Sequence, residues 1–223
     1  TRVLGTGPLV NGQIAGDLIL AVGGDPTLDT DDLGDMATAL RAAGVRSVAG
    51  RYLAFGGALP DLPRIATDQP DQVGYNPGLS GLMLNFGRVY FEWKKAGDGW
   101  TISMDARGER FAPKIDLTRM ELAQREAPLF TYRLREATED WTVAQTALGK
   151  EGSRWLPVRR ATPYVAEAFR ALAARWPQAT ISMSSRRCFW PRSVTASGKQ
   201  ATSSSTMVTF LASIQNSPCG PES

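Results

Sequence analysis

Nucleophilic catalysis is the first chemistry to look for, and the residue types in this chain restrict it. The 223-residue sequence contains no histidine, so it offers neither a Ser-His-Asp triad nor a Cys-His pair. Zinc sites that use histidine are excluded for the same reason. The two cysteines, Cys188 and Cys219, both lie near the C-terminal end. One pair of thiols is too few for a thiolate metal site, and the sequence leaves open whether the two residues pair. We therefore expect no metal or other cofactor.

A lysine amine can also activate a serine hydroxyl, which alone is too weakly acidic to attack an amide. None of the lysines has a serine three residues before it, the spacing of one such serine–lysine couple; they are Lys94, Lys95, Lys114, Lys150 and Lys199. We therefore assign no catalytic residue in this chain.

Two further features could bind a ligand. Asp25, in the turn sequence Gly-Gly-Asp-Pro, could bind a metal or an amine, but a turn-forming aspartate that accepts backbone hydrogen bonds is the favoured interpretation. Several tryptophans could stack on a sugar, although aromatic residues at strand ends more often pack in a core or a hairpin. They are Trp93, Trp100, Trp141 and Trp155.

Composition narrows the class of protein. Hydrophobic residues make up 43% of the chain and charged residues 21%, which is typical of a globular protein with a buried core. The formal charge is only +3, and bases alternate with acids through most of the chain, so no nucleic-acid partner is expected. No apolar run approaches the roughly 18 residues that a transmembrane helix needs. The chain opens on Thr1 without a signal-peptide pattern, so we expect any export signal to lie outside it.

A strand-helix-strand unit is predicted near the N-terminus. Residues 17–22 form a short apolar run bounded by turn residues, which favours a buried strand. A helix should follow, with Thr30 as its N-cap, acidic residues in its first turn and Gly44 at its end. Residues 45–55 then return as a strand, and this order is typical of a parallel α/β unit.

The middle of the chain differs from the N-terminal part in composition and in its predicted elements. Residues 56–79 form a long loop rich in glycine and proline, and loops of this length are usually functional or disordered. Residues 82–93 are then predicted as a long strand that pairs with residues 100–104 in a hairpin. Further short strands are expected at residues 114–117, 129–134 and 141–147. We interpret this part as an antiparallel β module inserted into the α/β unit.

The predicted fold class is therefore α+β, with a helix near residues 162–176 and a disordered or poorly packed tail. Residues 1–80 together with 145–178 should form the α/β domain, and residues 81–144 the β insert. Residues 179–223 are rich in serine, and their amino-acid composition differs from that of the preceding residues. A reading-frame shift or an unrelated fused end would explain that tail.

Several segments, in order, resemble one enzyme family. They are Gly16-Asp17 with Gly24-Asp-Pro-Thr-Leu28, Ala43-Gly-Val45, Gly50-Arg51 and Tyr75-Asn-Pro-Gly-Leu-Ser-Gly-Leu-Met-Leu-Asn-Phe86. The chain is similar over residues 1–176 to the penicillin-binding D-alanyl-D-alanine carboxypeptidase/endopeptidase family. Gly87 stands where that family often has a second asparagine.

The resemblance implies a periplasmic serine-type hydrolase that acts on peptidoglycan stem peptides through an acyl-enzyme. In that family a catalytic domain is interrupted by an inserted α/β domain that carries a β domain. The catalytic domain uses Ser-x-x-Lys, Ser-x-Asn and Lys-Thr-Gly boxes, and none of the three occurs in this sequence. The chain therefore corresponds to the insertion. We expect it to be inactive alone and to contact the stem peptide only together with the missing catalytic domain.

The resemblance also implies a substrate pocket at Asp71 and Tyr75. In the family, an acidic residue just before the aromatic of this motif helps to receive the amino end of the diamino-acid side chain. A carboxylate beside an aromatic face suits an ammonium group. A solvated aspartate in a proline-rich loop is the alternative interpretation of Asp71.

A second function of another class stays open, namely a non-catalytic module that binds peptidoglycan or a protein partner through the β insert. A metal-dependent or Ser-His hydrolase is disfavoured because its ligands and its base are absent.

Overall fold

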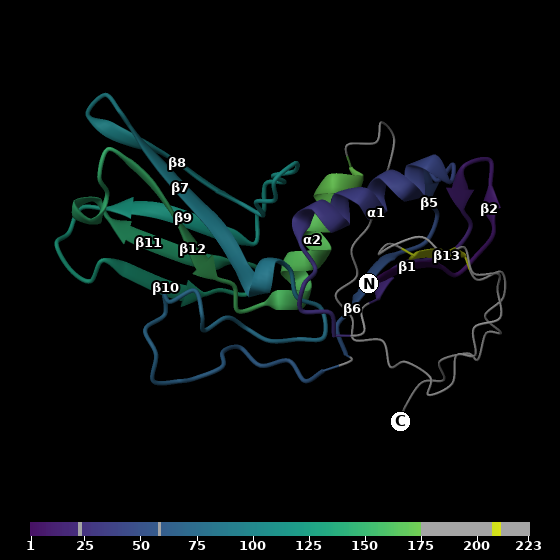
Figure 1. The fold of residues 1–223 in the computed structure, drawn as a ribbon, viewed down its shortest axis with the longest axis horizontal. Helices are drawn as coiled ribbons and strands as arrows, with labels where there is room; N and C mark the ends of the chain where they lie inside the picture. Colours follow the sequence, from purple (N-terminus) through teal and green to yellow (C-terminus); the bar gives the residue numbers. More distant parts are fainter. Residues whose placement is uncertain (22–23, 58, 175–206, 211–223) are drawn as a thin grey trace.

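The computed structural model describes residues 1–21, 24–57 and 59–174, and the backbone of residues 207–210. Figure 1 shows a β module at one end, the sheet that contains the N-terminal strand toward the other end, and two helices between them. The fold class is α+β, as the sequence predicts. Cys188, Cys219 and most of the tail expected to be disordered lie outside the described residues.

The sheet that contains the N-terminus has the strand order β13-β1-β4-β6. Strands β4 (Leu18–Ala21) and β6 (Tyr52–Phe55) are parallel, which confirms the predicted strand-helix-strand unit. Strand β1 (Arg2–Gly5) adds to β4 in antiparallel orientation. On its other side β1 pairs in parallel with β13 (Met207–Phe210), so this part of the tail is a strand.

The connecting helix α1 (Thr30–Ala42) begins one residue earlier than its predicted cap implies. The N-cap is Asp29 rather than Thr30: its carboxylate accepts a hydrogen bond from the backbone N–H of Asp32, and the Asp32 carboxylate accepts one from the backbone N–H of Asp29. This reciprocal capping box satisfies two N–H groups that a helix start leaves unpaired. Gly44, at a φ of 87°, ends the helix as expected.

A second helix and a small sheet complete this half of the molecule. Helix α2 (Ala161–Ala173) packs against α1 and β6 and buries Tyr164, Val165 and Phe169 completely. The small sheet consists of β2 (Leu9–Val10), β3 (Gln13–Ile14) and β5 (Ser47–Val48). The predicted strand over residues 45–55 is therefore two short strands that belong to different sheets.

The β module consists of two three-stranded sheets. One has the order β12-β7-β8 and is antiparallel throughout, with β7 at Arg88–Ala96, β8 at Gly99–Asp105 and β12 at Glu151–Pro157. The other has the order β10-β11-β9, with β9 at Thr118–Ala123, β10 at Phe130–Leu134 and β11 at Glu139–Ala144. Strands β9 and β11 run parallel, so the insert is not purely antiparallel. The fully buried Phe91, Trp141, Val143 and Leu156 belong to the hydrophobic core.

Several boundaries differ from the sequence-based expectation. Of the strand predicted over residues 114–117, only an isolated bridge between Lys114 and Asp105 is present, and β9 begins at Thr118 instead. The long strand predicted over residues 82–93 begins only at Arg88: residues 82–84 are not in a strand, and the turn η1 (Asn85–Gly87) follows them, with positive φ values of 52° at Asn85 and 57° at Phe86. The strand predicted from residue 141 begins at Glu139 and ends at Ala144, where the turn η2 (Gln145–Ala147) follows. Strand β12 lies within residues 145–178 and pairs with β7 of the predicted insert. The two-domain division of the chain remains a prediction.

No helix within the described residues is both long and apolar enough to cross a membrane.

Candidate functional site

The loop that carries Asp71 and Tyr75 is closed on itself by Asn76. The Asn76 side chain is 1% exposed, and its Oδ1 accepts hydrogen bonds from the backbone N–H groups of Ile65 and Ala66 at 2.9 and 2.8 Å. Its Nδ2 donates to the carbonyl oxygen of Ala66 at 2.8 Å. A buried amide with three such bonds fixes one part of a loop against another, because each bond lost inside the protein leaves an unpaired polar group.

A buried arginine from another part of the chain holds the same loop. Arg159 follows β12 and is 5% exposed. Its Nη1 donates to the carbonyl oxygen of Asn76, and its Nη2 donates to the carbonyl oxygen of Asp71 at 2.8 Å. The planar guanidinium carries several donors in a fixed arrangement, so one side chain can bind two carbonyl groups at once.

A buried carboxylate fixes the backbone of Arg159. Glu139 at the start of β11 is 0% exposed, and its oxygens accept hydrogen bonds from the backbone N–H of Arg159 at 3.1 and 2.9 Å. It also accepts one from the backbone N–H of Arg160 at 2.7 Å. Burial raises the pKa of Glu139, and these hydrogen bonds oppose that rise without cancelling it.

Asp71 lies at the surface beside two arginines. Its carboxylate is 39% exposed, with Oδ1 lying 3.4 Å from Nη1 of Arg64 and 3.7 Å from Nη2 of Arg159. The charge of Asp71 is thus matched from within the chain. Arg64 is itself partly exposed, and exposed ion pairs contribute little stability.

Tyr75 presents an open aromatic face on the same loop. The residue is 69% exposed, and its hydroxyl donates a hydrogen bond to Oε1 of Gln69 at 2.9 Å. Asp71 and Tyr75 therefore lie on one loop whose backbone is anchored at several points. That the two residues form a pocket for a ligand remains a prediction.

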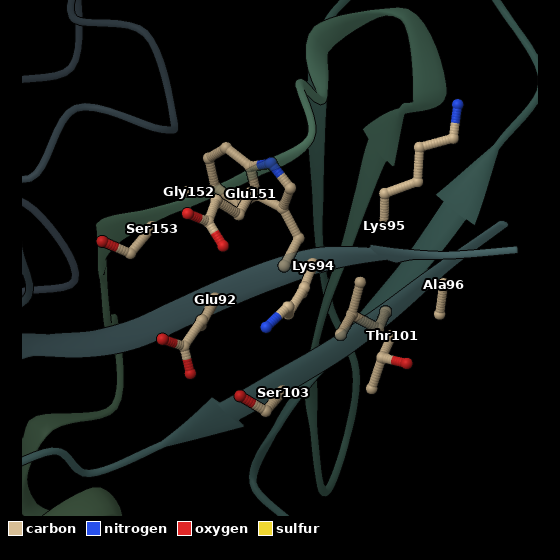
Figure 2. Close-up of a pocket in the computed structure, with 11 residues that line it drawn as sticks. Glu92, Lys94, Lys95, Ala96, Thr101, Ser103, Glu151, Gly152 and Ser153 are labelled. Atoms are coloured by element: carbon tan, nitrogen blue, oxygen red, sulfur yellow. The ribbon is translucent and has the colours of Figure 1, made fainter.

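A hollow of about 790 Å³ with both polar and apolar lining lies on the β12-β7-β8 sheet. Figure 2 shows Glu92 and Lys94 of β7 with Ser103 of β8 and Ser153 of β12 around it, while Lys95 extends in another direction. Thr101 and Glu151 add a further hydroxyl and a further carboxylate. The hollow thus carries charges of both signs and several hydroxyl groups, and Trp93 and Ile102 add apolar surface to it.

The tryptophans mostly serve packing, as the favoured interpretation predicts. Trp141 is 0% exposed, and the Trp100 indole N–H donates to the carbonyl oxygen of Gly149 at 2.9 Å. Trp93 lies against Phe91 with ring centroids 5.3 Å apart. Trp155 packs edge-on against Tyr90 at 5.0 Å. Trp141, at the least, is inaccessible to a sugar.

Asp25 is a turn residue, also as expected. Its Oδ1 accepts hydrogen bonds from the backbone N–H and the hydroxyl of Thr27 at 3.0 and 2.8 Å. These bonds, the side-chain one foremost, lower the pKa of Asp25. Among the residues that the structure describes, no group of three His, Cys, Asp or Glu side chains is arranged to hold a metal ion.

Sequence reasoning missed Glu139 and Arg159, although a signal for Glu139 exists. Glu139, Trp141 and Val143 alternate along β11, and all three are buried, so the period of two that marks an inward strand face includes the glutamate. A charged residue at such a position needs partners, and its presence there could have indicated a polar junction.

Comparison with known proteins gives one family. The D-Ala-D-Ala carboxypeptidase 3 (S13) family model matches residues 1–175. No curated protein matches the chain significantly. The fold is similar to a crystal structure of penicillin binding protein 4 (dacB) from Haemophilus influenzae, with 15% identity and a TM-score of 0.59 over 84% of this chain and 43% of that chain.

A second crystal structure of penicillin binding protein 4 (dacB) from Haemophilus influenzae, complexed with a novel beta-lactam, is similar as well. The identity is 16% and the TM-score 0.50, over 83% of this chain and 41% of that chain. The chain thus spans less than half the length of the structures that it resembles.

Proposed function

Because this chain belongs to the D-Ala-D-Ala carboxypeptidase 3 (S13) family, we propose that it is the non-catalytic part of a serine-type D-Ala-D-Ala carboxypeptidase/endopeptidase. In the whole enzyme, a serine outside these residues attacks the D-Ala-D-Ala end of a peptidoglycan stem peptide. D-Ala leaves, and water then hydrolyses the acyl-enzyme. The observation that carries the proposal is the family match over residues 1–175, and a periplasmic location follows from the substrate.

The role of this chain in that reaction is to supply a wall of the substrate cleft. Asp71 would receive an ammonium group of the stem peptide, with the Tyr75 ring beside it. The support for this role is geometric: both side chains are at least partly exposed, and the loop that bears them is tied down through Asn76 and Arg159. An anchored loop presents its side chains in one arrangement, which limits the entropy lost on binding.

Ligand titration tests the role of Asp71. The probe is a tetrapeptide with a free amine on its diamino-acid side chain, and the N-acetylated peptide serves as the ligand control. NMR titration of the chain should show shifts in the segment around residues 69–76 with the free amine only, and Asp71→Asn should abolish them. The matched control is Asp68→Asn, an exposed carboxylate on the same loop. Equal shifts in wild type and Asp71→Asn would contradict the proposal.

The hollow on the β12-β7-β8 sheet favours a second candidate function. Its hydroxyl and charged side chains could bind peptidoglycan directly, and the chain would then be a binding module in its own right. Co-sedimentation with purified cell-wall sacculi distinguishes the two functions. Strong binding that survives Asp71→Asn and is lost in Glu92→Ala with Ser103→Ala would favour the binding module.

A further inference from the structure

We propose that Arg159 is a positioning residue that holds the Asp71–Asn76 segment in its ligand-binding conformation. This inference rests on the proposed role of Asp71 and Tyr75. The guanidinium donates to the carbonyl oxygens of Asp71 and Asn76. These two residues bracket the segment, and Tyr75 lies between them. One side chain thus fixes both ends of the part of the loop that carries the candidate ligand-binding groups.

Burial makes this anchor effective. The Arg159 side chain is only 2% exposed, so water competes little for its donors, and a hydrogen bond in such surroundings is stronger than one in solvent. Loss of the guanidinium would leave the carbonyl groups of Asp71 and Asn76 without this donor. Because unpaired carbonyl groups inside a protein are costly, the segment would open toward water rather than keep its place.

The anchor is itself held by three contacts. Glu139 accepts hydrogen bonds from the backbone N–H of Arg159, and the backbone N–H of Gly78 donates to the carbonyl oxygen of Val158 at 2.7 Å. The Tyr132 ring lies 5.7 Å from the centre of the guanidinium. These contacts come from β10, from β11 and from the end of the loop itself. The position of the Asp71–Asn76 segment therefore depends on the β module, although the segment belongs to a distant part of the sequence.

Hydrogen exchange measured by mass spectrometry tests the proposal on the intact chain. In Arg159→Ala, amides in residues 66–78 should exchange faster by about tenfold or more, while amides of α1 should keep their rates. Guanidinium ion at low millimolar concentration should restore protection in this variant, because it can occupy the vacated site and donate to the same carbonyl groups. Sodium chloride at equal concentration should not. The matched control is Arg154→Ala on β12, whose guanidinium lies over the Phe130 ring and should leave the loop unchanged.

Other results overturn the proposal. Unchanged exchange in residues 66–78 would do so, and so would a uniform increase across the chain or a restoration by sodium chloride. If Arg159→Ala has no cooperative melting transition, Arg159→Lys replaces it. The lysine ammonium is a compact point charge on a flexible stem, so this variant should protect the segment only in part. Protection equal to that of wild type would contradict the proposal. Asp71→Asn should not alter exchange, so a failed ligand titration and a failed positioning role give different results.

Discussion

The carboxylate of Glu139 holds Arg159 by its main chain, with both carboxylate oxygens within 3.1 Å of the Arg159 backbone nitrogen. The same carboxylate accepts from the backbone N–H of Arg160, the N-cap of α2, which has no side-chain cap of its own. A buried negative charge at this point also complements the positive end of the helix dipole. Glu139 thus joins strand β11, helix α2 and the loop of Asp71.

Removal of the Glu139 carboxylate should destabilise the fold strongly. Glu139→Ala would leave the buried N–H groups of Arg159 and Arg160 without this acceptor, and we expect a loss of about 2–4 kcal/mol in the free energy of unfolding. Urea unfolding followed by tryptophan fluorescence measures it. Glu136→Ala, at an exposed position three residues earlier, should change the value by less than about 0.5 kcal/mol. Similar losses of unfolding free energy in Glu139→Ala and Glu136→Ala would contradict the stabilising role of the Glu139 carboxylate.

Glu139 should also give stability a distinctive dependence on pH. Its pKa in the folded state is raised by burial, so the folded protein binds this proton more tightly than the unfolded chain does. The contribution of Glu139 to stability should therefore fall as pH rises above the ordinary glutamate pKa of about 4.3. The unfolding free energy of wild type minus that of Glu139→Gln should therefore decrease as the pH is raised in steps from about 4 to about 8. An increase would show that the sign is wrong.

Asp17 should behave in the opposite way. Burial raises its pKa, but hydrogen bonds from the side chain and backbone of Arg51 outweigh burial and hold the pKa below its ordinary value. The stability that Asp17 contributes should be present above about pH 4 and be lost as pH falls further. Wild type should therefore lose stability in acid more steeply than Asp17→Asn, while Asp61→Asn, at an exposed loop position, should follow wild type. Parallel curves for wild type and Asp17→Asn would contradict this.

Gly78 should not tolerate a side chain. A Cβ atom there would lie 2.3 Å from the carbonyl oxygen of Arg159 and 2.7 Å from its carbonyl carbon, and backbone atoms cannot move aside easily. We expect Gly78→Ala to cost about 1–3 kcal/mol in unfolding free energy. Gly149→Ala is the control, because nothing lies within 4 Å of its added Cβ. If thermal denaturation shows equal melting temperatures for the two variants, the close approach of the loop to Arg159 is wrong.

Local patterns in the sequence predict both α-helices of the described residues and about half of the strands, but they miss β9 and β12. The apolar run before Asp25, the acidic residues at the start of α1 and Gly44 at its end are short-range signals, and each marks an element that the structure contains. The turn role of Asp25 follows from the same kind of local chemistry. The S13 family membership was likewise indicated by short motifs in order along the chain.

Long-range pairing could not be predicted in this way. Nothing local indicates that β9 lies parallel to β11, because parallel partners are chosen by the packing of the whole module. The break at Asn85 and Phe86 was missed because Asn85 stands between the apolar residues Leu84 and Phe86, which favour a strand. In the structure the Asn85 side chain binds Thr30 of α1, with its Nδ2 2.9 Å from the Thr30 hydroxyl. Glu139, Arg159 and Asp71 are far apart in the sequence, and hydrogen bonds connect them only in the folded chain.

Labelling with a fluorescent penicillin tests most directly the claim that this chain shapes a substrate cleft without catalysing the reaction. Penicillin acylates the serine of a serine–lysine couple in enzymes of this class, and no lysine here has a serine three residues before it. The purified chain should therefore form no stoichiometric covalent adduct by gel fluorescence and intact-mass spectrometry. A stoichiometric adduct that peptide mapping assigns to one serine would contradict the account.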